Sequence, residues 1–167
     1  MPDQRLPANA WERDERTVGW VYGSILTGAA TVAASATIAS KPWQVPVYTA
    51  ATMIVVWVAH AYAAFVGHGG RLEIGELEDR LRHAAATELP VLLSSTPALA
   101  ALGIAWLVGA DVSVTGLVGL LAAIATMAAL AAGAARRTGA GTAGVAAAGG
   151  GAVVLGALLI GAKVLLK

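Results

Sequence analysis

Long apolar runs, separated by short polar segments, fill almost the whole chain of 167 residues. Five of these runs have the roughly 20 residues that an α-helix needs to cross the hydrocarbon layer of a membrane. We therefore expect five spanning helices, at about residues 18–39, 47–66, 89–108, 114–135 and 142–164. Because residues 1–17 are polar, we expect a cytoplasmic N-terminal segment followed by a single transmembrane domain over residues 18–167.

The one long polar connection, residues 68–88, has the period of an amphipathic helix. Its apolar positions fall on one helical face and its polar positions on the other. The apolar face holds Ile74, Leu77, Leu81, Ala84 and Ala85, and the polar face holds Glu73, Glu76, Arg80 and His83. We expect this helix on the cytoplasmic side, lying on the membrane surface or docking under the bundle.

Two of the predicted spans contain residues that disturb a regular helix. Ser94-Ser95-Thr96-Pro97 lies in the third span, where a proline frees a backbone carbonyl and bends the helix. Gly149-Gly150-Gly151 lies in the fifth span and lowers its helix propensity. We expect a neighbouring backbone to pack closely on these glycines, with a flexible hinge as the alternative.

The composition agrees with a membrane protein and excludes several other classes. Hydrophobic residues make up 57% of the chain and charged residues 13%, which is too apolar for an ordinary soluble domain. The net charge of +1 argues against a nucleic-acid partner, which would need a concentrated basic face. Since the chain has no cysteine, disulfides and thiolate metal sites are excluded. The sequence predicts an all-α, polytopic helical bundle in contact with membrane lipid.

The distribution of Lys and Arg predicts the orientation, because cytoplasmic connections carry an excess of both. With five spans, one side holds Arg5, Arg13, Arg16, Arg71, Arg80, Arg82, Arg136 and Arg137, and the other holds Lys41, Lys163 and Lys167. We therefore expect a multi-pass protein of the plasma (inner) membrane with its N-terminus in the cytoplasm and its C-terminus outside. If the glycine-rich last segment does not cross, the C-terminus lies inside.

Four hydroxyl residues recur at helical spacing in the first span and share one face of the helix. They are Ser24, Thr27, Thr31 and Ser35, and we call them the hydroxyl stripe. The stripe can line a water-filled path across the membrane. It can equally lie in a helix–helix contact in which the hydroxyls bond to backbone carbonyls. The sequence leaves both interpretations open.

A histidine in the second span is the first candidate for a functional side chain, because a titratable ring in hydrocarbon is costly unless it is satisfied. Trp57 lies three residues before His60, so the two share a face. Arg16 is expected at a comparable depth, at the cytoplasmic end of the first span. His60 can be a hydrogen-bonded packing residue, a pH sensor because imidazole titrates near physiological pH, or a metal ligand.

We expect no metal, cofactor or catalytic site. His68, His83, Glu73 and Glu76 can join His60 only if the polar connection folds back, and no H-x-x-x-H or E-x-x-H spacing supports a metal site. The sequence also lacks a nucleophile elbow, a phosphate-binding glycine loop and a pair of intramembrane carboxylates. An enzyme is therefore disfavoured.

Two segments resemble a known family. The first helix begins Arg16-Thr17-Val18-Gly19-Trp20-Val21-Tyr22, and the second carries Trp57-Val58-Ala59-His60. They resemble the endolysosomal and prokaryotic potassium channels, whose first helix begins R-x-x-x-F-S-D and whose second carries W-x-x-H. Val21 and Tyr22 stand where that family has serine and aspartate, and five helices are predicted here against six in the family.

The resemblance implies that the first helix lines a pore on a four-fold axis. It also implies that Arg16, Trp57 and His60 form a network on the cytoplasmic side that braces the pore helices. Trp20 stands in the place of the family's phenylalanine.

Two functions are consistent with these patterns. The first is a homo-oligomeric cation channel, with a tetramer favoured, in which K⁺ or H⁺ passes with weak selection along the hydroxyl stripe. Arg16, Trp20, Trp57 and His60 would then brace the helices and sense pH. The alternative is a non-conducting scaffold or assembly subunit of a larger complex, for which the Ala- and Gly-rich fourth and fifth spans offer close-packing faces.

Overall fold

The computed structural model describes residues 9–67 and 77–165, with side chains for residues 18–67, 77–161 and 164–165. These residues form helices joined by short turns, with no strand among them, so the expected all-α class is confirmed. In chain order the elements are α1 (Asn9–Ala33), the π-helical turn η1 (Ala34–Ile38), α2 (Gln44–Gly67), α3 (Leu77–Thr87), α4 (Leu89–Leu93), α5 (Thr96–Leu107), α6 (Val112–Arg137) and α7 (Thr142–Leu165).

Four stretches of the described helices are long and apolar enough to cross a membrane. They are Val18–Ile38, Gln44–Gly67, Val112–Arg137 and Thr142–Gly161. The region of the third predicted span is divided instead into two helical pieces, Leu77–Leu93 and Thr96–Leu107, which are bent by 47°. The described residues thus contain four candidate spans, and a fifth crossing by the bent pair stays a prediction.

The bend predicted around Pro97 is confirmed, and proline explains it. Pro97 lies in the first turn of α5 and Pro90 in the first turn of α4. A missing backbone N–H costs little in a first turn, whereas in a continuous helix the ring would clash with the preceding turn. The chain therefore begins a new helix at each proline.

A helix-capping aspartate and two glycines form the turns on either side of α6. The carboxylate of Asp111 accepts a hydrogen bond from the backbone N–H of Val114 at 2.8 Å and so begins α6. Gly109 follows α5 with φ 82° and Gly139 follows α6 with φ 75°. Both angles lie in the left-handed region that favours glycine after a helix.

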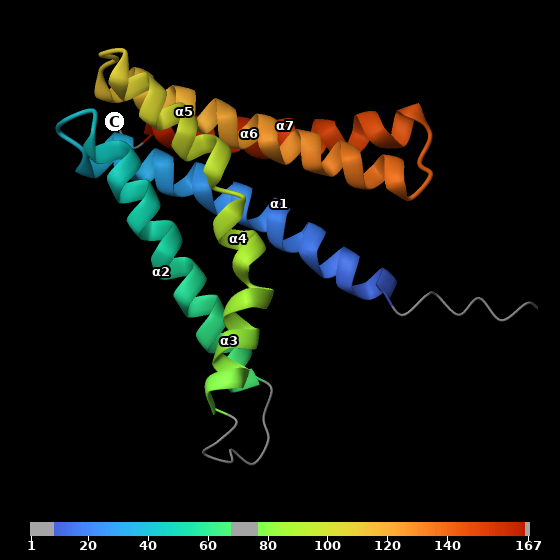
Figure 1. Cartoon of the computed structure of the whole chain (residues 1–167). Helices are drawn as coiled ribbons and strands as arrows, with labels where there is room; N and C mark the ends of the chain where they lie inside the picture. Colours follow the sequence, from blue (N-terminus) through green and yellow to red (C-terminus); the bar gives the residue numbers. More distant parts are fainter. Residues whose placement is uncertain (1–8, 68–76, 166–167) are drawn as a thin grey trace, which may run out of the picture.

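The helices converge at one end of the molecule and diverge toward the other (Figure 1). At the first end lie the connection from η1 to α2 and the turn between α5 and α6. From there α2 and α3 run side by side in one direction, and the α6–α7 hairpin runs in another. Helix α1 lies between these two arms and packs against both α2 and α6.

Helix α1, with the η1 turn that continues it, forms the most buried of the four candidate spans. Half of the residues in its spanning window are buried, against 6% for α2 and 11% for α7. A small apolar core at the convergent end joins η1, α2 and α5 through Ala34, Val45 and Leu102. Helices α2 and α7 therefore turn most of their apolar surface away from the chain's own interior.

The amphipathic character expected for residues 68–88 is described only in part. Ile74, Glu73 and Glu76 lie outside the described residues. On α3, Leu77 and Leu81 are exposed, while Ala84 is buried, where α3 packs beside α2. A position of this helix at a membrane surface stays a prediction.

The expected close backbone contact at Gly149-Gly150-Gly151 is wrong within this chain. A Cβ atom at any of the three would meet no atom within 4 Å. Close approaches occur instead at Gly23, which meets α4, and at Gly156, which meets Ile124 of α6. The reason is that a different face of α7 packs against α6, so the glycine triplet does not take part in that contact.

Candidate functional site

The hydroxyl stripe lies inside the chain, and its hydroxyls bond to backbone carbonyls. All four residues are buried, with side chains at most 8% exposed. Ser24 Oγ donates to Trp20 O at 2.9 Å, and Thr27 Oγ1 donates to Gly23 O at 2.7 Å. Thr31 Oγ1 donates to Thr27 O at 2.8 Å, and Ser35 Oγ to Val32 O at 3.4 Å. Each hydroxyl proton is thus satisfied within the stripe's own helical segment.

Neighbouring helices cover the stripe from several sides. Thr27 Oγ1 lies 3.5 Å from the sulfur of Met53 on α2. A Cβ atom on Gly28 would meet Leu120 of α6 at 3.5 Å and Leu159 of α7 at 2.9 Å. The stripe therefore faces the interior of one chain, which is the arrangement of a helix–helix contact. A pore-lining role stays a prediction, and it would require water to enter between α1 and these neighbours.

The break between α4 and α5 packs directly on α1. A Cβ atom on Gly23 would overlap Ser94 Oγ and the carbonyl oxygen of Val91. Ser94 Oγ donates to that same carbonyl at 2.7 Å, and Ser95 Oγ donates to Leu92 O at 2.6 Å. The two serines thus satisfy carbonyls next to the break, and the glycine lets the helix backbones approach. The contact leaves no room for a ligand.

Two further threonines are also buried, and sequence reasoning did not single them out. Thr115 on α6 donates to Ala110 O at 3.4 Å. Thr49 on α2 is fully buried, and its hydroxyl has no hydrogen-bond partner among the described residues. Val45, Thr49 and Met53 recur every four residues and are all buried, so helical spacing was the signal that could have found Thr49.

Trp57 and His60 lie on α2 and contact different neighbours. Trp57 Nε1 donates to the backbone carbonyl of Ala85 on α3 at 3.1 Å. His60 Nδ1 lies 2.9 Å from Val56 O, and because a carbonyl only accepts, Nδ1 must carry the proton. The His60 ring also lies against Tyr22 of α1, with ring centroids 5.4 Å apart and planes tilted by 53°. This pair of residues therefore ties α2 to both α3 and α1.

Of the other two members of the predicted network, Trp20 has a different set of neighbours. Trp20 lines a cavity with residues of α6, among them Arg137. Arg16 belongs to α1, but its side chain lies outside the described side chains. Tyr22, which sequence reasoning treated only as a departure from the channel motif, is the aromatic contact of His60. Tyr22 is two residues from Trp20, and residues at that spacing point to different sides of a helix. Helical spacing could therefore have predicted that Trp20 and Tyr22 contact different neighbours.

No group of three potential metal ligands lies together among the described residues. His83 is among the described residues, whereas His68, Glu73 and Glu76 are not. The expectation that the chain holds no metal therefore remains a prediction.

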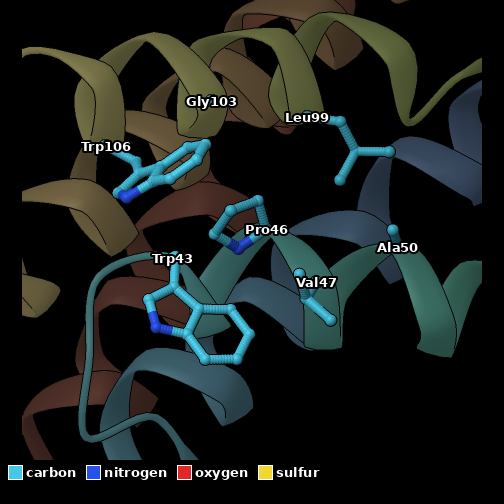
Figure 2. A pocket seen from close by; sticks show the side chains of 7 residues that line it. All are labelled: Trp43, Pro46, Val47, Ala50, Leu99, Gly103 and Trp106. Atoms are coloured by element: carbon cyan, nitrogen blue, oxygen red, sulfur yellow. The ribbon is translucent and has the colours of Figure 1, made fainter.

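We describe two of the cavities that open on the surface of the bundle. The first has a volume of about 430 Å³ and lies between α2 and α5, lined by Trp43, Pro46, Val47, Ala50, Leu99, Gly103 and Trp106. Figure 2 shows the two indoles at one end of it, with Pro46 between them. The second has a volume of about 300 Å³ and lies between α1 and α6, lined by Trp20, Ala129, Leu130, Gly133, Ala134 and Arg137. Of the two, only the second contains a charged side chain.

The resemblance to potassium channels depends on Arg16, Trp57 and His60, and the side chains of the last two are the ones described here. Their contacts, to α3 and to Tyr22, are compatible with a bracing role in any helical bundle. Comparison of the chain with models of protein families, with curated proteins and with solved structures finds no match, so the resemblance stays a prediction.

Proposed function

We propose that the chain is a non-conducting helical membrane module that acts as a scaffold or assembly subunit of a larger complex. The observation that carries this proposal is the burial of the hydroxyl stripe. Its four hydroxyls face the chain's own interior and donate to carbonyls of the same helical segment. Hydroxyls whose protons are satisfied by their own helix can be buried between packed helices, which supports a structural role for the stripe over an ion path.

The outward faces of the spans support the same proposal. Only 6% of the α2 spanning window and 11% of the α7 window are buried inside the chain, and these windows are apolar. Gly150 and Gly151 are exposed on α7 and have open space around them within the chain. Small residues allow another helix to approach closely in a membrane. We propose that α7 presents this face to another subunit of the complex.

A flux measurement tests the non-conducting part of the proposal. Purified protein reconstituted into liposomes should give no K⁺ or H⁺ flux above that of empty liposomes, over a range of pH and voltage. Thr27→Leu is the matched variant, because it removes a buried hydroxyl from the stripe. A flux in the native protein that changes in Thr27→Leu would contradict the proposal and establish a channel.

Affinity purification from native membranes tests the scaffold part. The proposal expects other membrane subunits to be recovered with the chain in a fixed ratio. Recovery of copies of this chain alone would contradict it. A clean tetramer in detergent, together with cation flux, would favour the channel that the resemblance implies.

The channel remains the second candidate because one observation favours it. Among the side chains that the structure describes, the buried polar ones are eight hydroxyls from α1, η1, α2, the α4–α5 region and α6: Ser24, Thr27, Thr31, Ser35, Thr49, Ser94, Ser95 and Thr115. The hydroxyl of Thr49 has no partner among the described residues. We propose as the alternative that K⁺ or H⁺ passes along these hydroxyls, with His60 and Trp57 bracing the helices.

We further propose that the chain lies in the plasma membrane with its N-terminus in the cytoplasm. The excess of arginine at the end where α6 finishes supports this orientation, because Arg136 and Arg137 lie there in the last turn of the helix.

A further inference from the structure

The cavity between α1 and α6 combines an apolar floor with one cationic side chain. Its floor runs along α6 from Ala129 to Arg137, with Trp20 of α1 on the opposite wall. Eight residues of helix rise by about 12 Å, so the cavity extends roughly that far along α6. Gly133 lies in the middle of the floor, where a Cβ atom would meet nothing within 4 Å.

The cavity lies at the end of the membrane-spanning segments. Trp20 is near the start of the span Val18–Ile38, and Arg137 is the last residue of the span Val112–Arg137. Helix α1 and the α6–α7 hairpin diverge toward this end of the molecule (Figure 1). The cavity therefore extends from the level of the lipid headgroups into the hydrocarbon layer.

The polar groups of the cavity are hydrogen-bond donors. Among the residues whose side chains the structure describes, the guanidinium of Arg137 has no ion-pair partner and the indole N–H of Trp20 has no hydrogen-bond acceptor. The carbonyls at the end of α6 already have donors, since the N–H of Thr138 bonds to Ala134 O and that of Gly139 to Arg136 O. The mouth of the cavity thus offers positive charge and donors to an anion, next to an apolar channel.

We propose that this cavity binds one anionic phospholipid, with an acyl chain along Ala129, Leu130 and Gly133 and with the phosphate at Arg137. The charge complements a phosphate that bears a net negative charge in the lipid, and the apolar floor complements a hydrocarbon chain. A soluble anion would use the arginine alone and leave the floor without a partner. The inference does not depend on whether the chain conducts ions.

Lipid titration of the purified protein, followed by native mass spectrometry, tests the proposal. The probes are phosphatidylglycerol and phosphatidylcholine with identical acyl chains. One phosphatidylglycerol should bind per chain, more tightly than phosphatidylcholine. Arg137→Gln should weaken phosphatidylglycerol binding by about fivefold, the effect of one basic residue near a membrane surface. Arg137→Lys should keep the preference, because it keeps the charge.

Matched variants distinguish lipid binding in this cavity from two general effects, the charge of the protein surface and the filling of any cavity. Arg136→Gln removes the adjacent arginine, which does not line the cavity, and should leave the preference intact. Gly133→Leu fills the cavity and should weaken binding of both lipids, whereas Gly103→Leu fills the cavity between α2 and α5 and should not. Gly133 and Gly103 both have open space at Cβ, so both variants are expected to fold.

Four outcomes would overturn the inference. They are equal binding of the two lipids, equal effects of Arg136→Gln and Arg137→Gln, an undiminished affinity in Gly133→Leu, and displacement of the lipid by inorganic phosphate at comparable concentration. The last result would assign the arginine to a soluble anion. If Gly133→Leu does not fold, as judged by its elution and thermal midpoint, the arginine variants decide the question by themselves.

Discussion

Gly23 is the residue at which the smallest change is expected to have the largest effect on stability. A Cβ atom there would overlap the Val91 carbonyl and Ser94 Oγ, both of which are held by a hydrogen bond to each other. Gly23→Ala should therefore lower the free energy of unfolding by about 1–3 kcal/mol, the usual cost of overpacking. Thermal unfolding in detergent measures the change.

Gly103→Ala is the control for that substitution. Gly103 is also within a helix, but a Cβ atom there would meet nothing within 4 Å. This variant should be as stable as the native protein or slightly more stable, because alanine is the better helix former. Equal stability of the two variants would mean that α1 and the α4–α5 break do not pack as described.

His60 is expected to act through its ring contact with Tyr22. His60→Phe keeps an aromatic ring at this position, whereas His60→Ala removes it. His60→Ala should therefore be the less stable variant, by about 0.5–1.5 kcal/mol, the range for an aromatic pair. Thermal midpoints of the two variants in the same detergent test this. If they were equal, the hydrogen bond from Nδ1 to Val56 O would be the interaction that matters.

At the scale of elements, a hydrogen bond between the Trp57 side chain and the backbone of α3 joins the two helices of the arm formed by α2 and α3. Trp57 Nε1 donates to Ala85 O at 3.1 Å. Trp57→Phe keeps an aromatic ring but removes this donor, and it should cost about 0.5–1.5 kcal/mol. The loss should appear as faster amide hydrogen exchange in α3, while α6 is unaffected.

Trp106→Phe is the control for Trp57→Phe. The Trp106 side chain is 45% exposed, and its indole has no hydrogen-bond partner among the described residues. Hydrogen exchange in α3 should stay at the native rate in this variant. Unchanged exchange in Trp57→Phe as well would show that this hydrogen bond is not needed to hold α3 beside α2.

At the scale of the whole molecule, the orientation in the membrane can be tested by labelling, because the chain has no cysteine of its own. Ser40 and Thr138 are exposed in turns at opposite ends of the spans. With the N-terminus in the cytoplasm, a membrane-impermeant maleimide should label Ser40→Cys in intact cells. It should label Thr138→Cys only after the membrane is permeabilised. The reverse pattern would overturn the proposed orientation.

Local sequence features determined the elements of this protein. Apolar runs about 20 residues long predict helices that can cross a membrane, and four such stretches are present among the described residues. Pro97 predicts the bend before α5 because a proline cannot continue the helix, and the pieces on either side are bent by 47°. These features depend on neighbours within a turn or two, which is why they can be read without a structure.

The tertiary structure decided which faces meet. Spacing alone places the members of the hydroxyl stripe on one helical face. Only the packing of α2, α4, α6 and α7 around that face puts the stripe inside the chain. Likewise, Trp20 and Tyr22 are two residues apart, yet one lies with Arg137 on α6 and the other with His60 on α2. Such contacts join residues far apart in sequence, and they depend on how each helix is rotated against its neighbours. Helical periodicity specifies which residues share a face, but not which neighbour that face meets.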